Sequence, residues 1–130
     1  MADKKISVLF VEDNKLARKM ARIILEQLNC MVDLVETGRM AIEYANKSNY
    51  DIIFMDIGLP DVDGLTVIEY IRNTKGKNHY SPIIALTAHS DQEYVNQSYE
   101  VGANDYLVKP LDGQVGKKIL EKYVPFCLSM

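Results

Sequence analysis

Charged and hydroxyl side chains follow short apolar runs at several points in this sequence. They are Glu12 and Asp13 after the first run, Asp56 after the third, Thr87 at the end of the fourth and Lys109 after the fifth. Taken one at a time, each has an ordinary structural explanation, such as capping of the first helix by Asp13 or Asn14. Together they indicate a site, because the carboxyl ends of parallel strands meet at one edge of a sheet.

The chemistry of such a site follows from its charges. Carboxylates at close range raise one another's pKa unless a cation lies between them. Mg²⁺ suits this position, because it prefers a few carboxylate oxygens together with water and phosphate oxygens. Asp13 and Asp56 suit direct ligation, and Glu12 suits ligation through a water molecule. With Lys109 as a fixed positive charge and Thr87 as a donor to phosphoryl oxygens, the set is typical of phosphoryl transfer to a carboxylate nucleophile.

The apolar runs that would position these side chains are short and mostly continuous. They are Ile6–Val11, Met31–Val35, Ile52–Met55, Pro82–Leu86 and Tyr106–Val108. Continuous rather than alternating apolar residues are typical of parallel strands buried on both faces. We therefore predict five parallel strands.

Five amphipathic stretches separate or follow these runs. Apolar residues recur there at helical spacing, for instance Ala17, Met20, Ala21, Ile24 and Leu28 in the first stretch. Helices are also predicted around residues 40–45, 65–71, 91–101 and 115–123, with Gly102 as a C-terminal cap. The methionines are expected mostly in the core, Tyr94 and Tyr99 as packing residues, and His79 in solvent. The order predicts an α/β fold, a doubly wound parallel sheet with right-handed crossovers.

Composition limits the class of protein. A chain of 130 residues is the size of one domain, which we assign to residues 1–130, and 48% hydrophobic with 25% charged residues is an ordinary globular balance. A net charge of −3 argues against direct nucleic-acid binding. No apolar run reaches the ~20 residues of a membrane helix, so we expect no membrane insertion of this chain. Cys30 and Cys127 fit no metal-binding spacing and are expected to be reduced, in the cytoplasm.

Four segments of the sequence resemble the receiver domains of bacterial two-component response regulators. They are Val11–Asn14, Met55–Gly64, Ala85–Ala88 and Gly102–Pro110. They occur in the family's order and spacing, and the resemblance extends over about residues 5–124. Asp56–Pro60, together with Thr87-Ala88-His89, is similar to the receivers of hybrid sensor histidine kinases.

The resemblance implies a role for each matching acidic residue. Asp56 would be the phosphoacceptor, receiving its phosphoryl group from the phosphohistidine of a histidine kinase or a histidine phosphotransfer protein. Glu12 and Asp13 would organise Mg²⁺, joined by Asp56 and the backbone carbonyl of Gly58. Lys109 would pair with the phosphoryl group. The fold implied is flavodoxin-like, with five helices and strand order 2-1-3-4-5.

The resemblance also implies a switch. Thr87 would be the switch hydroxyl and Tyr106 the aromatic side chain that moves inward, changing the face of the fourth helix, fifth strand and fifth helix for a downstream partner. The Lys109-Pro110 bond would be cis, with Pro110 at the edge of the site. Gly58 lacks the larger side chain often found at its position, and with His89 it is expected to control water access and thus phosphate lifetime.

Two other functions fit the same fold class. A flavin or nucleotide binder would carry a Gly/Ser/Thr-rich loop after the first strand, where this chain has Glu12 and Asp13. A metal-dependent phosphatase with an aspartyl nucleophile would have that nucleophile at the first strand and a capping insertion, and neither is visible in this sequence. We expect this chain to be no enzyme by itself, beyond catalysing its own phosphorylation and hydrolysis. It is either a stand-alone regulator, a phosphorelay intermediate or a segment of a hybrid kinase, and the motifs favour the last.

Overall fold

The computed structural model describes residues 4–88 and 92–125. The strands are β1 (Ile6–Val11), β2 (Cys30–Val35), β3 (Ile52–Asp56), β4 (Ile83–Thr87) and β5 (Asp105–Val108). The helices are α1 (Lys15–Gln27), α2 (Gly38–Lys47), α3 (Gly64–Asn73), α4 (Gln92–Glu100) and α5 (Gly113–Tyr123). Strands and helices alternate along the chain as predicted, and no predicted strand is misplaced by more than one residue at either end.

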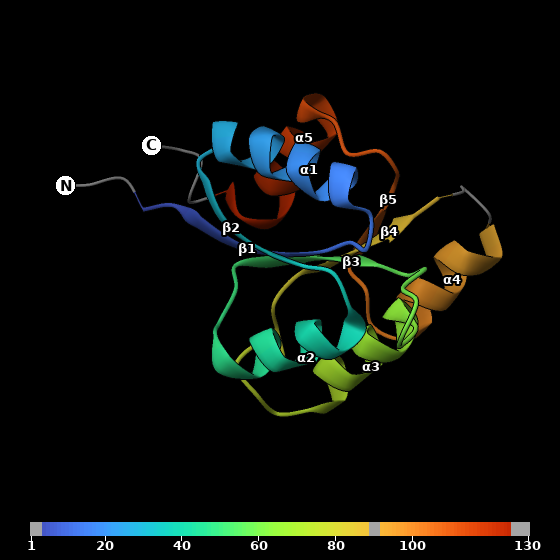
Figure 1. Ribbon diagram of the computed structural model, residues 1–130. Coiled ribbons are helices and arrows are strands. Elements are labelled where there is room, and N and C mark those ends of the chain that lie inside the picture. Colours follow the sequence, from blue (N-terminus) through green and yellow to red (C-terminus); the bar gives the residue numbers. More distant parts are fainter. Residues whose placement is uncertain (1–3, 89–91, 126–130) are drawn as a thin grey trace.

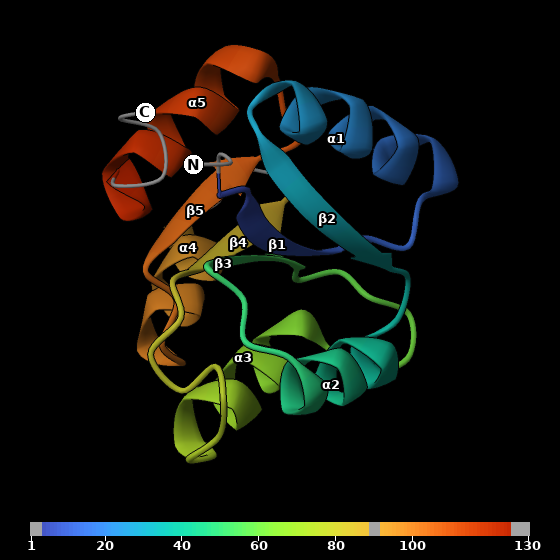
Figure 2. The ribbon, with the colours of Figure 1, turned by 90° about the vertical axis from the view of Figure 1, so that its left-hand side faces the viewer.

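The sheet is parallel throughout, in the order β2-β1-β3-β4-β5, which confirms the predicted topology. Helices α1 and α5 cover one face, and α2 and α3 cover the other, with α4 beside β5 (Figure 1). Figure 2 shows the same layers from the side. Such an arrangement leaves the carboxyl ends of the strands open between the helix layers.

The core consists of two apolar layers, one on each face of the sheet. Alternate strand residues serve the two layers: Val8 and Phe10 pack toward α1 and α5, whereas Leu9 and Val11 pack toward α2 and α3. Because both faces are covered, every residue of β3 is buried. This is the physical reason that the strands read as continuous apolar runs.

The loops that carry the site are held by local features. Asn14, rather than Asp13, caps α1, because its side chain accepts a hydrogen bond from the Ala17 N–H at 2.9 Å. Asp13 is thereby left for other contacts. A Cβ atom at Gly64 would lie 2.0 Å from the carbonyl oxygen of Asp56, so only glycine lets α3 begin this close to the end of β3.

Several burial predictions were wrong. Met20 and Met31 are 50% and 61% exposed, because the buried stripe of α1 centres on Ala21 and Leu25 and because β2 is an edge strand. Tyr94 and Tyr99 are 48% and 44% exposed, although the Tyr99 ring packs edge-on against that of Tyr106.

His79 is half-buried instead of solvated, and its ring packs edge-on against Tyr80. Cys30 is buried, as predicted, whereas Cys127 lies outside the described residues. Within residues 4–88 and 92–125, no helix combines the length and the apolar character needed to cross a membrane.

Candidate functional site

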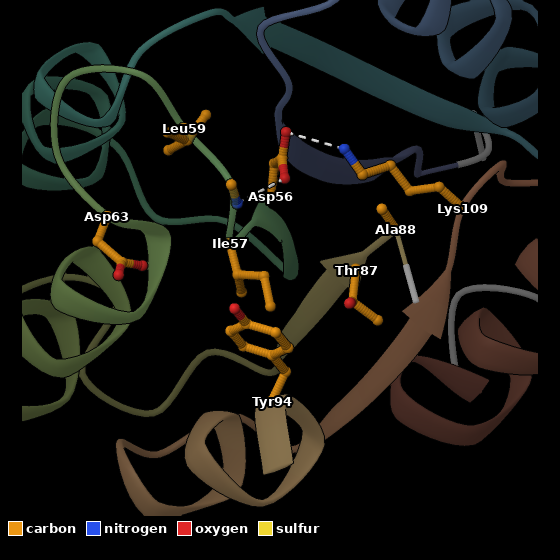
Figure 3. A pocket seen from close by; sticks show the side chains of 9 residues that line it. Asp56, Ile57, Leu59, Asp63, Thr87, Ala88, Tyr94 and Lys109 are labelled. Carbon is orange, nitrogen blue, oxygen red and sulfur yellow. Dashed lines mark hydrogen bonds and ion pairs between the residues drawn. The ribbon is translucent and has the colours of Figure 1, made fainter. Parts of the chain in front are cut away.

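The carboxyl ends of β1, β3 and β4, and the loop after β5, carry the predicted site residues to one end of the sheet. There, a cavity of about 510 Å³ is bordered by Asp56, Gly58, Thr87 and Lys109, among others. Figure 3 shows Asp56 at the end of β3, with the Lys109 side chain reaching toward it and Thr87 on the neighbouring strand. Glu12 and Asp13 lie directly beyond β1, next to this cavity.

Two of the carboxylates are buried and share one ammonium group. Glu12 and Asp56 are only 2% and 1% exposed. The Lys109 Nζ lies 3.1 Å from Glu12 Oε1 and 3.0 Å from Asp56 Oδ2. The other oxygen of each carboxylate accepts a hydrogen bond from the backbone: Asp56 Oδ1 from the Gly58 N–H, and Glu12 Oε2 from the Asn14 N–H. One ammonium therefore faces two buried carboxylates, and the group keeps an excess of negative charge.

The pKa shifts follow from this charge balance. Burial raises the pKa of Glu12 above its ordinary value, and the charge of Asp56 adds to that effect. Burial by itself would lower the pKa of the Lys109 ammonium, but its contacts with Asp56 and Glu12 outweigh burial and raise it. Lys109 therefore stays charged at neutral pH. A further cation would stabilise the charged form of the carboxylates.

The acidic residues fit a divalent metal ion. Glu12, Asp13 and Asp56 can each offer one oxygen, and these oxygens lie within 4.8 Å of one another. Asp56 Oδ2 is buried and, within the described residues, accepts no well-directed hydrogen bond despite the nearby ammonium. Hard carboxylate oxygens with one acceptor position unused are a donor set that suits Mg²⁺. The contribution of the Gly58 carbonyl stays a prediction.

One glycine, Gly58, and one aromatic residue, Tyr94, shape the mouth of the cavity. A Cβ atom at Gly58 would make only an ordinary contact, 3.6 Å from Asp56 Oδ1, so the space beside the acceptor is open there. Tyr94, from the first turn of α4, points its ring into the same cavity (Figure 3). The sequence reasoning missed Tyr94 as a site residue. Tyr94 could have been identified from its position near the start of the helix that follows Thr87.

The remaining predicted residues lie around this centre. Thr87 is 4% exposed and borders the cavity. Tyr106 is half-buried on β5, with its ring perpendicular to that of Tyr99 at 6.4 Å between centroids. The Lys109-Pro110 peptide bond is cis, as the resemblance implied. His89 lies outside the described residues.

Comparison with known proteins decides the family. The family profile described as the response regulator receiver domain matches residues 8–121. This chain belongs to the response regulator receiver family. The predicted recognition and fold are thus confirmed, since strand order and helices agree with those of solved receiver structures.

Related receivers occur in both kinases and regulators. The chain is 32% identical to Probable histidine kinase 1 of Oryza sativa subsp. indica, over 95% of this chain and 16% of that protein. It is 38% identical to the transcriptional regulatory protein ResD of Bacillus subtilis, over 79% of this chain and 41% of that protein. The chain therefore spans less than half the length of these relatives.

A solved structure with the same fold is the receiver domain of the sensor histidine kinase PA1611 from Pseudomonas aeruginosa PAO1. It superposes with a TM-score of 0.86 at 34% identity, covering 94% of this chain and 99% of that one. That structure contains a magnesium ion coordinated in its active-site cleft.

Proposed function

We propose that this receiver domain accepts a phosphoryl group on Asp56 from a phosphohistidine of a histidine kinase or a histidine phosphotransfer protein. The observation that carries the proposal is the Asp56 carboxylate, which is buried, borders an open cavity and lies 3.0 Å from the Lys109 ammonium. A carboxylate at the border of a cavity and beside a fixed cation has the two elements that phosphoryl transfer needs, a nucleophile and charge neutralisation.

In the proposed reaction, an Asp56 oxygen attacks phosphorus and the phosphorus–nitrogen bond of the donor breaks. The electron pair of that bond stays on the departing imidazole. The Lys109 ammonium offsets the charge on the phosphoryl oxygens, and the Thr87 hydroxyl, from the neighbouring strand, donates to one of them. Mg²⁺, held by Glu12, Asp13 and Asp56, would supply further positive charge; the PA1611 receiver supports this assignment.

A surface beside the site suits the phosphate donor. A groove of about 320 Å³ runs between α1 and the Lys109–Leu111 segment. Leu16 and Met20 of α1 line it and are 69% and 50% exposed. Because Glu12 and Lys109 border the same groove, an apolar partner surface seated there would bring its phosphohistidine to Asp56.

A second surface suits the downstream partner. The face of α4, β5 and α5 exposes Tyr99 and Val108, and the half-buried Tyr106 lies on β5 with its ring against that of Tyr99. On phosphorylation, we expect Thr87 to move toward the phosphoryl group and Tyr106 to follow into the vacated space, a shift between two packings of this face. As a separate chain the domain would be a switch, with no catalysis beyond its own phosphorylation and hydrolysis. Its motifs favour a segment of a hybrid kinase.

The phosphoacceptor assignment is tested with acetyl phosphate and Mg²⁺. Intact mass should show one added phosphoryl group on the wild-type protein and none on Asp56→Asn, since an amide oxygen is a poor nucleophile. Asp63→Asn is a matched control: Asp63 also borders the cavity, but its side chain caps α3 by accepting the Leu65 N–H, a role that Asn fills equally well. Equal labelling of wild type and Asp56→Asn would refute the proposal.

The switch is tested separately with Thr87→Ala. This variant should still accept the phosphoryl group, but the phosphate should no longer change the environment of Tyr106. Amide NMR shifts around Tyr106 are the measurement, taken before and after phosphorylation. Shifts equal to those of the phosphorylated wild type would contradict the role of Thr87.

A further inference from the structure

The Arg18 side chain binds the backbone of both acidic residues that follow β1. Its Nη1 donates to the carbonyl oxygens of Glu12 and Asp13, each at 2.9 Å. Its Nη2 lies 3.4 Å from Glu36 Oε2, beyond the end of β2. Only 17% of the Arg18 side chain is exposed. One guanidinium group thus connects α1, the loop after β1 and the loop after β2.

The charge of this arginine opposes both the dipole of α1 and any metal ion bound by the nearby carboxylates. It lies near the N-terminus of α1, the positive end of the helix dipole, and the first turn contains no acidic residue to offset it. It also lies beside Glu12 and Asp13, where its charge would oppose a bound metal ion. Its contact with Glu36 offsets this charge only in part, since Glu36 is 57% exposed. Acting through its charge alone, Arg18 would therefore weaken metal binding.

We propose that Arg18 is a positioning residue of the metal site, holding the loop of Glu12 and Asp13 in the geometry that binds Mg²⁺. The inference rests on the proposed function, because it assumes that these carboxylates are metal ligands. Asp13 is exposed, so few packing contacts restrict its side chain, and the direction of its carboxylate follows from the backbone that Arg18 fixes. Nη1 bonds both carbonyls while Nη2 contacts Glu36, and a lysine, with a single nitrogen on a shorter side chain, cannot keep all three contacts.

The two explanations predict opposite changes in Mg²⁺ affinity when Arg18 is replaced. If Arg18 acted only through its charge, removing it would make Mg²⁺ bind more tightly. If it positions the loop, removing it should weaken Mg²⁺ binding by about tenfold, the lower end of what loss of an outer-shell partner costs a metal site. Arg18→Met keeps most of the side-chain volume and removes every hydrogen bond. Arg18→Lys keeps the charge, so an electrostatic role predicts no change, whereas positioning predicts weaker binding.

A matched control lies one turn further along α1. Arg22 carries the same charge, but its side chain is 46% exposed and contacts only the Glu26 carboxylate, at 3.3 Å, among the ion pairs and hydrogen bonds of the described residues. Arg22→Met removes a positive charge from the same helix without touching the loop after β1. We expect it to leave Mg²⁺ affinity within about twofold of wild type.

The experiment is calorimetric titration of the four proteins with MgCl₂, with thermal unfolding recorded for each. Loss of affinity in both Arg18 variants, at temperatures where they are fully folded, supports positioning; a fall in Tm with unchanged affinity would show a merely structural role and overturn it. Tighter or equal binding by Arg18→Met also overturns it. If Arg18→Met fails to fold, the Arg18→Lys variant decides: Mg²⁺ affinity equal to that of the wild type would refute the positioning role. Absence of binding by the wild type would instead refute the proposed metal site itself.

Discussion

The two ends of the sheet bury polar groups in different ways. At the carboxyl end, Glu12, Asp56 and Lys109 are charged, and Asp56 Oδ2 accepts no well-directed hydrogen bond within the described residues. At the amino end, the buried Asn78 is neutral and fully bonded. Its Nδ2 donates to the carbonyls of Ala45 and Ser48, at 2.6 and 2.7 Å, and its Oδ1 accepts from the Tyr50 N–H at 2.8 Å and from Ser81 Oγ at 3.0 Å.

This difference separates stability from function. A buried polar group whose hydrogen bonds are all formed makes the fold more rigid. Removing that group leaves its partners without hydrogen bonds. Buried like charges with an acceptor to spare destabilise the unliganded protein but are ready to bind a cation and a phosphoryl group. Polar substitutions at the two ends should therefore change the free energy of unfolding with opposite signs.

The largest expected effect is at the amino end. Asn78→Ala would remove the partner of the buried Tyr50 N–H and the donor to the carbonyls of Ala45 and Ser48, so we expect a loss of about 3 kcal/mol in the free energy of unfolding. Urea unfolding measures it. Asn73→Ala, at an exposed position at the end of α3, is the control and should change stability by less than about 0.5 kcal/mol. Similar losses in both variants would remove the basis of the comparison.

A smaller effect of opposite sign is expected at the carboxyl end. Asp56→Asn relieves the repulsion between two buried carboxylates, while Lys109 keeps Glu12 as its partner. Without metal, we expect a gain of about 1 kcal/mol, as is common when a functional charge is removed. Urea unfolding in the presence of a chelator is the measurement. Added Mg²⁺ should then stabilise the wild type and not the variant; a loss of stability comparable to that of Asn78→Ala would show that the charged end stabilises the fold.

The smallest effect on stability is expected at Gly58. A side chain there meets only an ordinary contact with Asp56 Oδ1, at 3.6 Å, so Gly58→Asn should stay within about 0.5 kcal/mol of wild type. It should nevertheless change the rate of phosphate release severalfold by altering water access, with Mg²⁺ affinity nearly unchanged. A time course of phosphate release beside a metal titration tests this. An unchanged phosphate lifetime would show that Gly58 does not control water access.

The sheet could be predicted because its signals are local. The run Ile52–Met55 is apolar at every position, and this pattern is typical of a parallel strand whose two faces are both covered. Met20 and Tyr94 were assigned wrongly because helical spacing shows which residues share a face but not how far neighbouring elements cover it. In both cases the exposed side chain borders a cavity.

The centre of the site could be predicted because strand ends are visible in sequence. Asp56 and Thr87 follow their runs directly, and parallel pairing of β3 and β4 brings them together. The supporting contacts could not be predicted in this way. Arg72 contacts Asn104, 32 residues further along the chain, and Arg18 binds backbone carbonyls that no residue pattern marks. Such contacts depend on the packed fold rather than on local spacing.

The most direct test of the account is to locate the phosphoryl group itself. Borohydride reduces an acyl phosphate to an alcohol, so a phosphorylated aspartate becomes homoserine and can be assigned by peptide mass spectrometry. After treatment with acetyl phosphate and Mg²⁺, we predict homoserine at position 56, and none when Mg²⁺ is chelated. Homoserine at position 13, the corresponding alcohol at position 12, or no reduced residue in protein that carries the phosphoryl group would contradict Asp56 as the acceptor.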